Sequence, residues 1–264
     1  MKKIIAIALV LVIALGMAAC KETGNKTITV AASSTPHAEI LEVAKQVLAD
    51  KGWKLEIVTY DDYVTPNTLV DKGELDANYF QHLPYMETFN GENGTALVSV
   101  AAIHCEPMGL YPGTKSTVEE MLEGDRIAIP NDGSNRARAL MLLQSHGLID
   151  LADDVNMTAT VLDIVENPLN LEIVEMPAHE LVDARDDVAM VVINGNYALA
   201  AGLNVQQDAI AVEGATARGY ANILVVKDGN EDTPQIQALK EALTSPEVRN
   251  FINQNYGGAV IPLF

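Results

Sequence analysis

ITVAASSTPHAEILEVAKQVLADKGWKLEI, residues 28–57, is the stretch that decides the fold class. Its first five residues form an apolar run that is typical of a buried strand, and residues 53–57 alternate apolar with polar side chains as in a second strand. Between them, apolar residues at helical spacing over 40–48 predict an amphipathic helix, for which the hydroxyls of residues 33–35 are candidate N-caps. The unit is therefore β-α-β.

The same alternation of strands and helices continues to the C-terminus. Further strands are predicted at 75–80, 97–103, 126–130, 171–176, 188–193 and 221–226. Further helices are predicted at 65–73, 134–146, 178–185, 195–201, 233–243 and 246–256. Such alternation predicts an α/β protein with mostly parallel sheets covered on both faces. No linker rich in Pro, Gly or Ser interrupts the middle of the chain, so two lobes would be joined by crossing strands.

Residues 1–19 predict a secretion signal. Lys2 and Lys3 precede an unbroken apolar run over 4–15, which is shorter than the ~20 residues that a membrane-spanning helix needs. The run ends at a small-residue processing site whose last residue, Cys20, resembles the cysteine of a bacterial lipobox. We expect lipidation at Cys20, a polar tether over 20–26, and a protein anchored on the extracytoplasmic (periplasmic or extracellular) face of the cell membrane. An ordinary signal with a chance cysteine is the alternative.

The charge of the chain excludes some partners. The formal net charge is −19, and it becomes −21 when Lys2 and Lys3 leave with the signal. A protein this acidic is repelled by nucleic acid and by anionic lipid surfaces. We therefore expect no nucleic-acid partner, and we expect the protein to attach to the membrane only through the lipid on Cys20. Cys105 is the other cysteine of the chain, which leaves no internal disulfide if Cys20 is acylated.

DANYFQHLPY, residues 76–85, concentrates aromatic side chains in a chain that has one Trp, eight Tyr and four Phe. If residues 77–82 are extended, side chains alternate between two faces. One face then carries Asn78, Phe80 and His82, and the other carries Tyr79 and Gln81. The segment lacks the Val, Ile and Leu run of a core strand. It predicts a lined pocket, with a satellite core of satisfied tyrosines as the alternative.

Tyr63 and Tyr85 are placed to complete a box around Phe80 and His82. Such a box suits a flexible apolar side chain, and a thioether in particular, because sulfur gains ~0.3 to 1.5 kcal/mol against an aromatic ring. Nothing in the segment resembles an acid–base pair.

NDGSNRARAL, residues 131–140, follows a predicted strand and opens a helix, with Arg138 in about the first turn. A helix N-terminus and a guanidinium together favour a bound carboxylate. The alternative is that Arg136 and Arg138 are solvated surface charges. Asn194 lies in NGNY beyond the strand at 188–193, where ligands of α/β sheets bind. We expect Asn194 to face a ligand and Asn196 to be the helix N-cap, with a plain turn as the alternative.

His104-Cys105-Glu106 raises the possibility of a metal or a nucleophile. His104 and Glu106 share a strand face, but a second closely spaced set of ligands is missing, so we predict no metal. Cys105 points the other way and is expected to be buried. No GxSxG, Walker, HExxH or GxGxxG motif occurs, so we predict neither an enzyme nor a cofactor. A metal receptor using His37 with His104, or an enzyme using Cys105 or His82, are the alternatives.

Several segments together resemble one family. They are PHAEIL (36–41), DYV (62–64) with PN (66–67), GELDANYFQHLPY (73–85), His104 with EPMGLY (106–111), IAIPND (127–132), DIVENP (163–168), VINGNYAL (192–199) and residues 259–264. In this order they resemble the NlpA-type methionine-binding lipoproteins, which are the substrate-binding subunits of methionine ABC importers.

The resemblance implies a two-lobed periplasmic-binding-protein fold (type II-like), with the ligand cleft between lobe 1, residues 27–107 plus 223–264, and lobe 2, residues 108–222. It implies methionine as ligand, an ABC permease as partner, and a monomer. A methionine-containing dipeptide or another apolar amino acid is the alternative ligand. Carried over, the site residues are Tyr63, Phe80, His82 and Tyr85 around the side chain, Arg138 on the carboxylate, and Asn194 with Asn222 on the ammonium and carboxylate. Asn222, which opens the last strand, carries almost no signal by itself.

Overall fold

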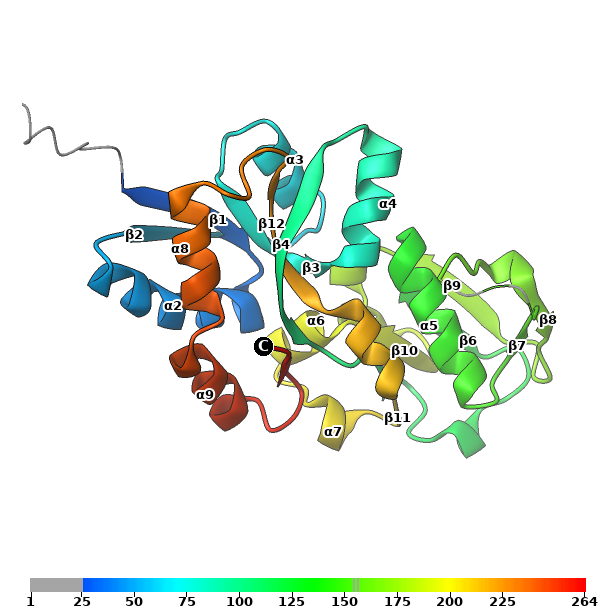
Figure 1. The fold of residues 1–264 in the computed structure, drawn as a ribbon. Coiled ribbons are helices and arrows are strands. Elements are labelled where there is room, and N and C mark those ends of the chain that lie inside the picture. The colour runs from blue at the N-terminus through cyan, green and yellow to red at the C-terminus, as the bar shows by residue number, and fades with distance from the viewer. Residues whose placement is uncertain (1–25, 154, 156) are drawn as a thin grey trace, which may run out of the picture.

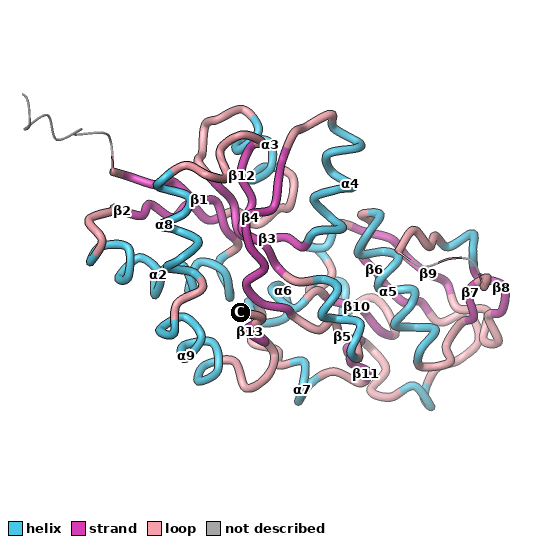
Figure 2. Tube along the Cα trace, viewed as in Figure 1, coloured by secondary structure: helices cyan, strands magenta, loops and turns pink. Residues whose placement is uncertain are grey.

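The computed structural model describes residues 26–264 except 154 and 156. The predicted signal, Cys20 and all but the last residue of the tether lie outside these residues. The two ends of the described chain build one lobe, blue to cyan and orange to red in Figure 1, and its middle builds the other, green to yellow. Figure 2 shows the strands of the two lobes as separate groups. No helix in the described ranges is long and apolar enough to cross a membrane.

A six-stranded sheet organises lobe 1. Its order is β13 (Ile261–Pro262), β4 (Leu97–Cys105), β12 (Asn222–Lys227), β3 (Ala77–His82), β1 (Thr27–Ala32) and β2 (Lys54–Thr59). The core on one face includes residues of α2 (Glu39–Asp50), α8 (Pro234–Leu243) and α9 (Pro246–Asn255). The core on the other face includes residues of α3 (Thr65–Asp71) and α4 (Leu83–Asn93).

A five-stranded sheet organises lobe 2. Its order is β11 (Ala211–Val212), β5 (Gly109–Pro112), β10 (Met190–Ile193), β6 (Arg126–Pro130) and β9 (Glu172–Met176). On one face α5 (Gly133–Ser145) packs into the core, and on the other α6 (Gly195–Ala200) and α7 (Val205–Asp208) contribute. The remaining elements are a small sheet of β7 (Asp150–Leu151) and β8 (Ile164–Glu166), a π-helical segment, and several 3₁₀ helices. The π-helical segment is η1 (Ser34–Ala38), and the 3₁₀ helices are η2 (Val118–Glu120), η3 (Val161–Asp163), η4 (Ala178–Glu180), η5 (Asp183–Asp186) and η6 (Ala215–Tyr220).

The α/β class and the two-lobed fold predicted from the sequence are confirmed, but the expectation of mostly parallel sheets is wrong. β1 pairs in parallel with β2 and β3, whereas β12 is antiparallel to both β3 and β4. The reason is topological. β12 starts at Asn222 beside His82 and His104, where β3 and β4 end, because the chain returns there from lobe 2.

Of two further local predictions, one holds in part and one is wrong. The single helix expected over 178–185 forms as two short 3₁₀ helices, η4 and η5, because acidic residues around Asp183 and Asp186 would crowd the negative end of a longer helix dipole. The hydroxyls of residues 33–35 do not cap α2, whose N-cap position is Ala38. Instead, the Ser33 hydroxyl bonds to Nδ1 of His37 at 2.7 Å.

Two crossing segments connect the sheets. Residues 106–108 lead from β4 to β5, and residues 213–221 lead from β11 to β12. The segments are bonded to each other, since Glu213 N donates to the carbonyl of Met108 at 2.9 Å and Met108 N donates to Glu213 Oε2 at 3.1 Å. Glu106 and Glu213 therefore lie at the junction of the two lobes.

Candidate functional site

The facing ends of the two sheets bring the predicted residues together. His82 ends β3 and Asn222 starts β12, while Asn194 follows β10 and Arg138 lies on α5 beyond β6. They surround a small cavity between the two sheets. The lining residues are Tyr63, Phe80, Gln81, His82, Tyr85, Glu106, Asn135, Arg138, Asn194, Gly195, Asn196 and Asn222. All seven residues proposed from the sequence are among them.

Three aromatic rings form one part of the cavity wall. The ring centroid of Tyr63 lies 5.6 Å from that of Phe80 and 5.7 Å from that of Tyr85, and Phe80 and Tyr85 are 6.2 Å apart. These rings are also part of a core cluster beneath the sheet. The satellite core and the pocket wall, which the sequence offered as alternatives, are therefore the same rings.

The alternation of faces predicted for residues 77–82 holds only in part. Tyr79 packs into the core of α2 and α8, away from Phe80, as expected. Gln81, however, lies on the side of Asn78, and its Nε2 donates to Asn78 Oδ1 at 2.8 Å. The pairing of β3 with β12 shifts register at this point, and such a bulge turns the next side chain over.

His82 fixes the orientation of two asparagine amides across the site. Burial, followed by the charge of Arg138, lowers the pKa of His82 to about 3, so the imidazole is neutral. Its Nδ1 accepts from the N–H of Tyr85 at 3.2 Å, so Nε2 carries the proton and donates to Asn135 Oδ1 at 3.0 Å. Asn135 Oδ1 also accepts from Asn194 Nδ2 at 2.9 Å. This leaves Asn194 Oδ1 as a buried acceptor without a partner among the described residues.

Arg138 is buried, which excludes the alternative of a solvated surface charge. Its Nε and Nη2 bond to the carboxylate of Glu213, and Nη2 also donates to the carbonyl of Glu106 at 2.7 Å. The guanidinium carbon lies 4.4 Å from the ring centroid of Tyr220. Nη1 has no hydrogen-bond partner within the described ranges, so it is free to bind a ligand. Arg138 lies in the second turn of α5, one turn later than expected.

The roles expected within NGNY are partly wrong. Asn194, not Asn196, occupies the N-cap position of α6, although its side chain makes no capping bond. Asn196 lies inside the helix, and its Oδ1 accepts from the hydroxyl of Tyr63 at 2.6 Å. Asn194 faces the cavity, as expected, while Asn196 connects lobe 2 to the aromatic box of lobe 1.

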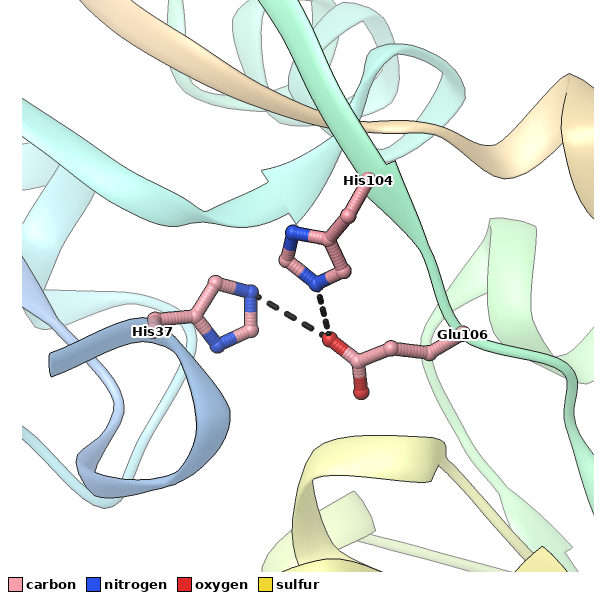
Figure 3. A group of neighbouring side chains, drawn as sticks. All are labelled: His37, His104 and Glu106. Atoms are coloured by element: carbon pink, nitrogen blue, oxygen red, sulfur yellow. Dashed lines mark hydrogen bonds and ion pairs between the residues drawn. The ribbon is translucent and has the colours of Figure 1, made fainter. Parts of the chain in front are cut away.

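His37, His104 and Glu106 form a buried cluster beside the cavity, and their potential ligand atoms lie within 4.8 Å of one another (Figure 3). Two histidines and a carboxylate are a donor set that zinc uses. Here the three groups bond to each other and to their neighbours. His104 Nε2 lies 2.7 Å from Glu106 Oε1, and His37 Nε2 lies 2.9 Å from Asn222 Oδ1. The arrangement fits a hydrogen-bond network, with each imidazole nitrogen engaged.

Burial decides the charge states of this cluster. It lowers the pKa of His37 to about 4 and that of His104 to about 3, so both imidazoles are neutral near pH 7. It also raises the pKa of Glu106, an effect that His37 and Arg138 oppose. Cys105 is fully buried as expected, and burial raises the pKa of its thiol. A buried thiol with a raised pKa is a poor nucleophile, which speaks against an enzyme using Cys105.

Five residues that line the cavity were not proposed as site residues from the sequence: Gln81, Glu106, Asn135, Gly195 and Asn196. All five stand inside quoted motifs, but nothing in the local pattern indicated that they face a cavity. Glu213, which holds Arg138 from outside the lining, lies in no quoted motif. Their positions depend on how the two lobes meet, which local pattern does not encode.

Two lobes that enclose a small cavity lined by aromatic rings and polar groups define a solute-binding protein. The chain belongs to the NlpA lipoprotein family, whose model matches residues 28–264.

Several known proteins are similar to this chain over most or all of its length. The methionine-binding lipoprotein MetQ of Bacillus subtilis is 41% identical over 272 residues, covering 100% of this chain and 99% of the relative. The crystal structure of a lipoprotein from Ruminococcus gnavus matches with a TM-score of 0.89 and 55% identity, covering 90% of this chain and 100% of that one. A nutrient binding protein from Burkholderia cenocepacia, solved bound to methionine, matches with a TM-score of 0.86 and 39% identity over 90% of this chain and 100% of its own.

Proposed function

We propose that this chain is a lipid-anchored extracytoplasmic substrate-binding protein that captures methionine and delivers it to an ABC importer. The observation that carries the proposal is the composition of the cavity. It combines three aromatic rings with a free guanidinium nitrogen of Arg138 and a buried, unpartnered acceptor at Asn194. These groups complement an apolar side chain, a carboxylate and an ammonium group. The names of MetQ and of the methionine-bound relative support the same ligand.

Each part of the ligand has a counterpart in the site. The thioether packs among Tyr63, Phe80 and Tyr85, where sulfur–aromatic contact is favourable. The carboxylate binds Arg138 Nη1, with charge-assisted hydrogen bonds that are stronger than neutral ones. The ammonium donates to Asn194 Oδ1. Without that bond, burying this acceptor carries a free-energy penalty, because it has no hydrogen-bond donor. No bond of the ligand is made or broken, in keeping with a binding protein rather than an enzyme.

Contacts between the lobes give a route from binding to transport. Tyr63 donates to Asn196 at 2.6 Å, Tyr197 donates to the carbonyl of Asp61 at 2.6 Å, and His82 bonds to Asn135. A ligand that touches both lobes favours the closed arrangement by as much as its affinity differs between the open and closed states. The closed monomer then docks on the permease.

Further parts of the proposal concern the ends and borders of the chain. The mature protein begins at lipidated Cys20, which anchors it to the cell membrane. Lobe 1 comprises residues 27–107 plus 223–264, and lobe 2 comprises residues 108–222. No cofactor or metal takes part.

Two measurements test the proposed function. Small molecules released by denaturing the purified protein are expected to include methionine by mass spectrometry. After removal of that ligand, L-methionine is expected to bind with a stoichiometry of one in calorimetry. Release of a methionine dipeptide, of another amino acid or of stoichiometric zinc would replace methionine as the ligand, and the same experiment distinguishes these cases.

We predict that Tyr63→Phe weakens L-methionine binding by roughly fivefold, because it removes one inter-lobe hydrogen bond of about 1 kcal/mol and keeps the ring. Asn196→Ala is expected to cost about as much, and the double variant little more, because both remove the same bond. Calorimetry on the four proteins measures the coupling. Tyr60→Phe is the control, since Tyr60 does not line the cavity. Strictly additive losses would show that the Tyr63–Asn196 bond does not contribute to binding.

A further inference from the structure

Glu106 is the acidic residue among the described residues that line the cavity. Its side chain is 5% exposed. Oε1 is engaged by His104 at 2.7 Å and lies 3.4 Å from His37 Nε2. Oε2 has no hydrogen-bond partner in the described ranges, and it lies against Gly195, which also lines the cavity. Burying a carboxylate this deeply is costly unless both of its oxygens accept hydrogen bonds. The second oxygen of Glu106 is therefore expected to accept a hydrogen bond from a ligand.

Oε2 lies against α6, the helix that follows Asn194. A Cβ atom at Gly195, the next residue in the chain, would come within 2.7 Å of Glu106 Oε2. Gly195 therefore provides the space that the carboxylate occupies. The lining of the cavity thus includes two acceptor side chains, Glu106 and Asn194, and one of them is anionic. Two acceptors in one cavity suit a ligand group that donates several hydrogen bonds.

The buried cluster determines which group donates and which accepts in each of the surrounding hydrogen bonds. Because Glu106 Oε1 accepts, His104 Nε2 donates to it, and His104 Nδ1 is left to accept from the hydroxyl of Tyr79. His37 Nε2 faces the same carboxylate oxygen and therefore also carries its proton, which it donates to Asn222 Oδ1. The Nδ2 group of Asn222 has no partner among the described residues and is free to donate into the cavity.

From these contacts we infer that Glu106 is the anionic counter-group for the α-ammonium of the ligand, and that His104 and His37 are positioning residues that orient Glu106 and Asn222. The inference rests on the proposed function and deepens it. It assigns the buried cluster a role in recognition, with no metal involved. It also states the ligand class: the site selects an apolar amino acid with a free, charged α-amine next to its carboxylate.

Glu106→Gln tests the assignment with two ligands. The probes are L-methionine and 4-(methylsulfanyl)butanoate, which is methionine without its amino group. We expect the variant to lose roughly 10- to 100-fold in affinity for L-methionine, the range of a charge-assisted hydrogen bond, and to keep its affinity for the analogue. Glu175→Gln is the control, since it removes an equal charge from an ion pair with Arg136 outside the cavity.

His104 provides the test of positioning. His104→Phe removes the donor to Glu106 and is expected to lower L-methionine affinity selectively, with little further loss when combined with Glu106→Gln. His104→Gln restores an N–H donor and is expected to recover part of that loss. A role in packing alone would weaken both ligands equally in both variants.

The outcomes separate the two proposals. Equal losses for both ligands in Glu106→Gln, or an unchanged affinity for L-methionine, would overturn the counter-group and leave the methionine receptor intact. A wild-type protein that binds neither ligand would overturn the proposed function, and the inference with it.

Discussion

Arg138→Ala is expected to reduce the affinity for L-methionine by roughly 100-fold or more, because removal of a buried, hydrogen-bonded charge from a carboxylate is among the costliest changes in an interface. Arg138 is 4% exposed, and its Nη1 has no partner among the described residues, so it is held ready for the ligand carboxylate. Calorimetry measures the loss. The analogue methioninol, which lacks the carboxylate, should bind the variant about as well as it binds the wild type.

Two companion variants keep this result interpretable. Removing Arg138 alone leaves Glu213 as a buried charge without its partner, which destabilises the fold. Arg138→Ala with Glu213→Gln removes that charge, and it should still fail to bind methionine while its thermal midpoint recovers. Arg136→Ala is the matched control, since Arg136 pairs with Glu175 and does not line the cavity. Unchanged methionine affinity in a folded Arg138 variant would contradict the proposed clamp.

The sequence predicted most elements of the fold because their signals are local. The apolar run of β1 and the helical spacing of α2 are properties of adjacent residues, and both elements form close to the expected bounds. The sheets are less parallel than expected because β12 pairs with strands more than a hundred residues earlier in the chain. That pairing is a consequence of the chain crossing twice between lobes. Strand β5, which the prediction lacked, is a four-residue segment too short to show a periodicity.

The residues of the candidate site also divide into those that local sequence signals reveal and those that only the folded structure reveals. Residues with a distinctive side chain in a distinctive motif, such as Phe80 and Arg138, were recognisable from the sequence and do line the cavity. Residues whose role depends on which group donates a hydrogen bond and which accepts it were not recognisable from the sequence. Glu106 suggested a metal ligand because it stands two residues from His104, and its relation to the cavity emerges only when the crossing segments place it against Gly195. Asn196 is not the N-cap that we expected, because the helix begins at Gly195, as its predicted bounds had it, and the N-cap position therefore falls on Asn194.

Gly195→Ala is expected to lower both the affinity for L-methionine, by roughly tenfold or more, and the stability, by about 1 to 3 kcal/mol, the usual cost of overpacking a tight site. The added Cβ would lie 2.6 Å from the Cβ and 2.7 Å from Oε2 of Glu106. The nearest atom belongs to the rigid start of that side chain, so relief requires movement of the backbone at the lobe junction. The same movement displaces Oε2 from the place where we propose that it meets the ligand ammonium.

Gly91→Ala is the matched control for Gly195→Ala. Gly91 lies inside α4, its backbone is not in the left-handed region, and a Cβ there would have no atom within 4 Å. Alanine at such a position is expected to stabilise the protein by roughly 0.5 to 1 kcal/mol and to leave binding unchanged. Urea denaturation measures the stability of both variants, and calorimetry measures their affinity for L-methionine. If Gly195→Ala bound L-methionine as tightly as Gly91→Ala, the contact between Glu106 and α6 would be irrelevant to recognition, because a displaced carboxylate would then have had no effect on the ligand.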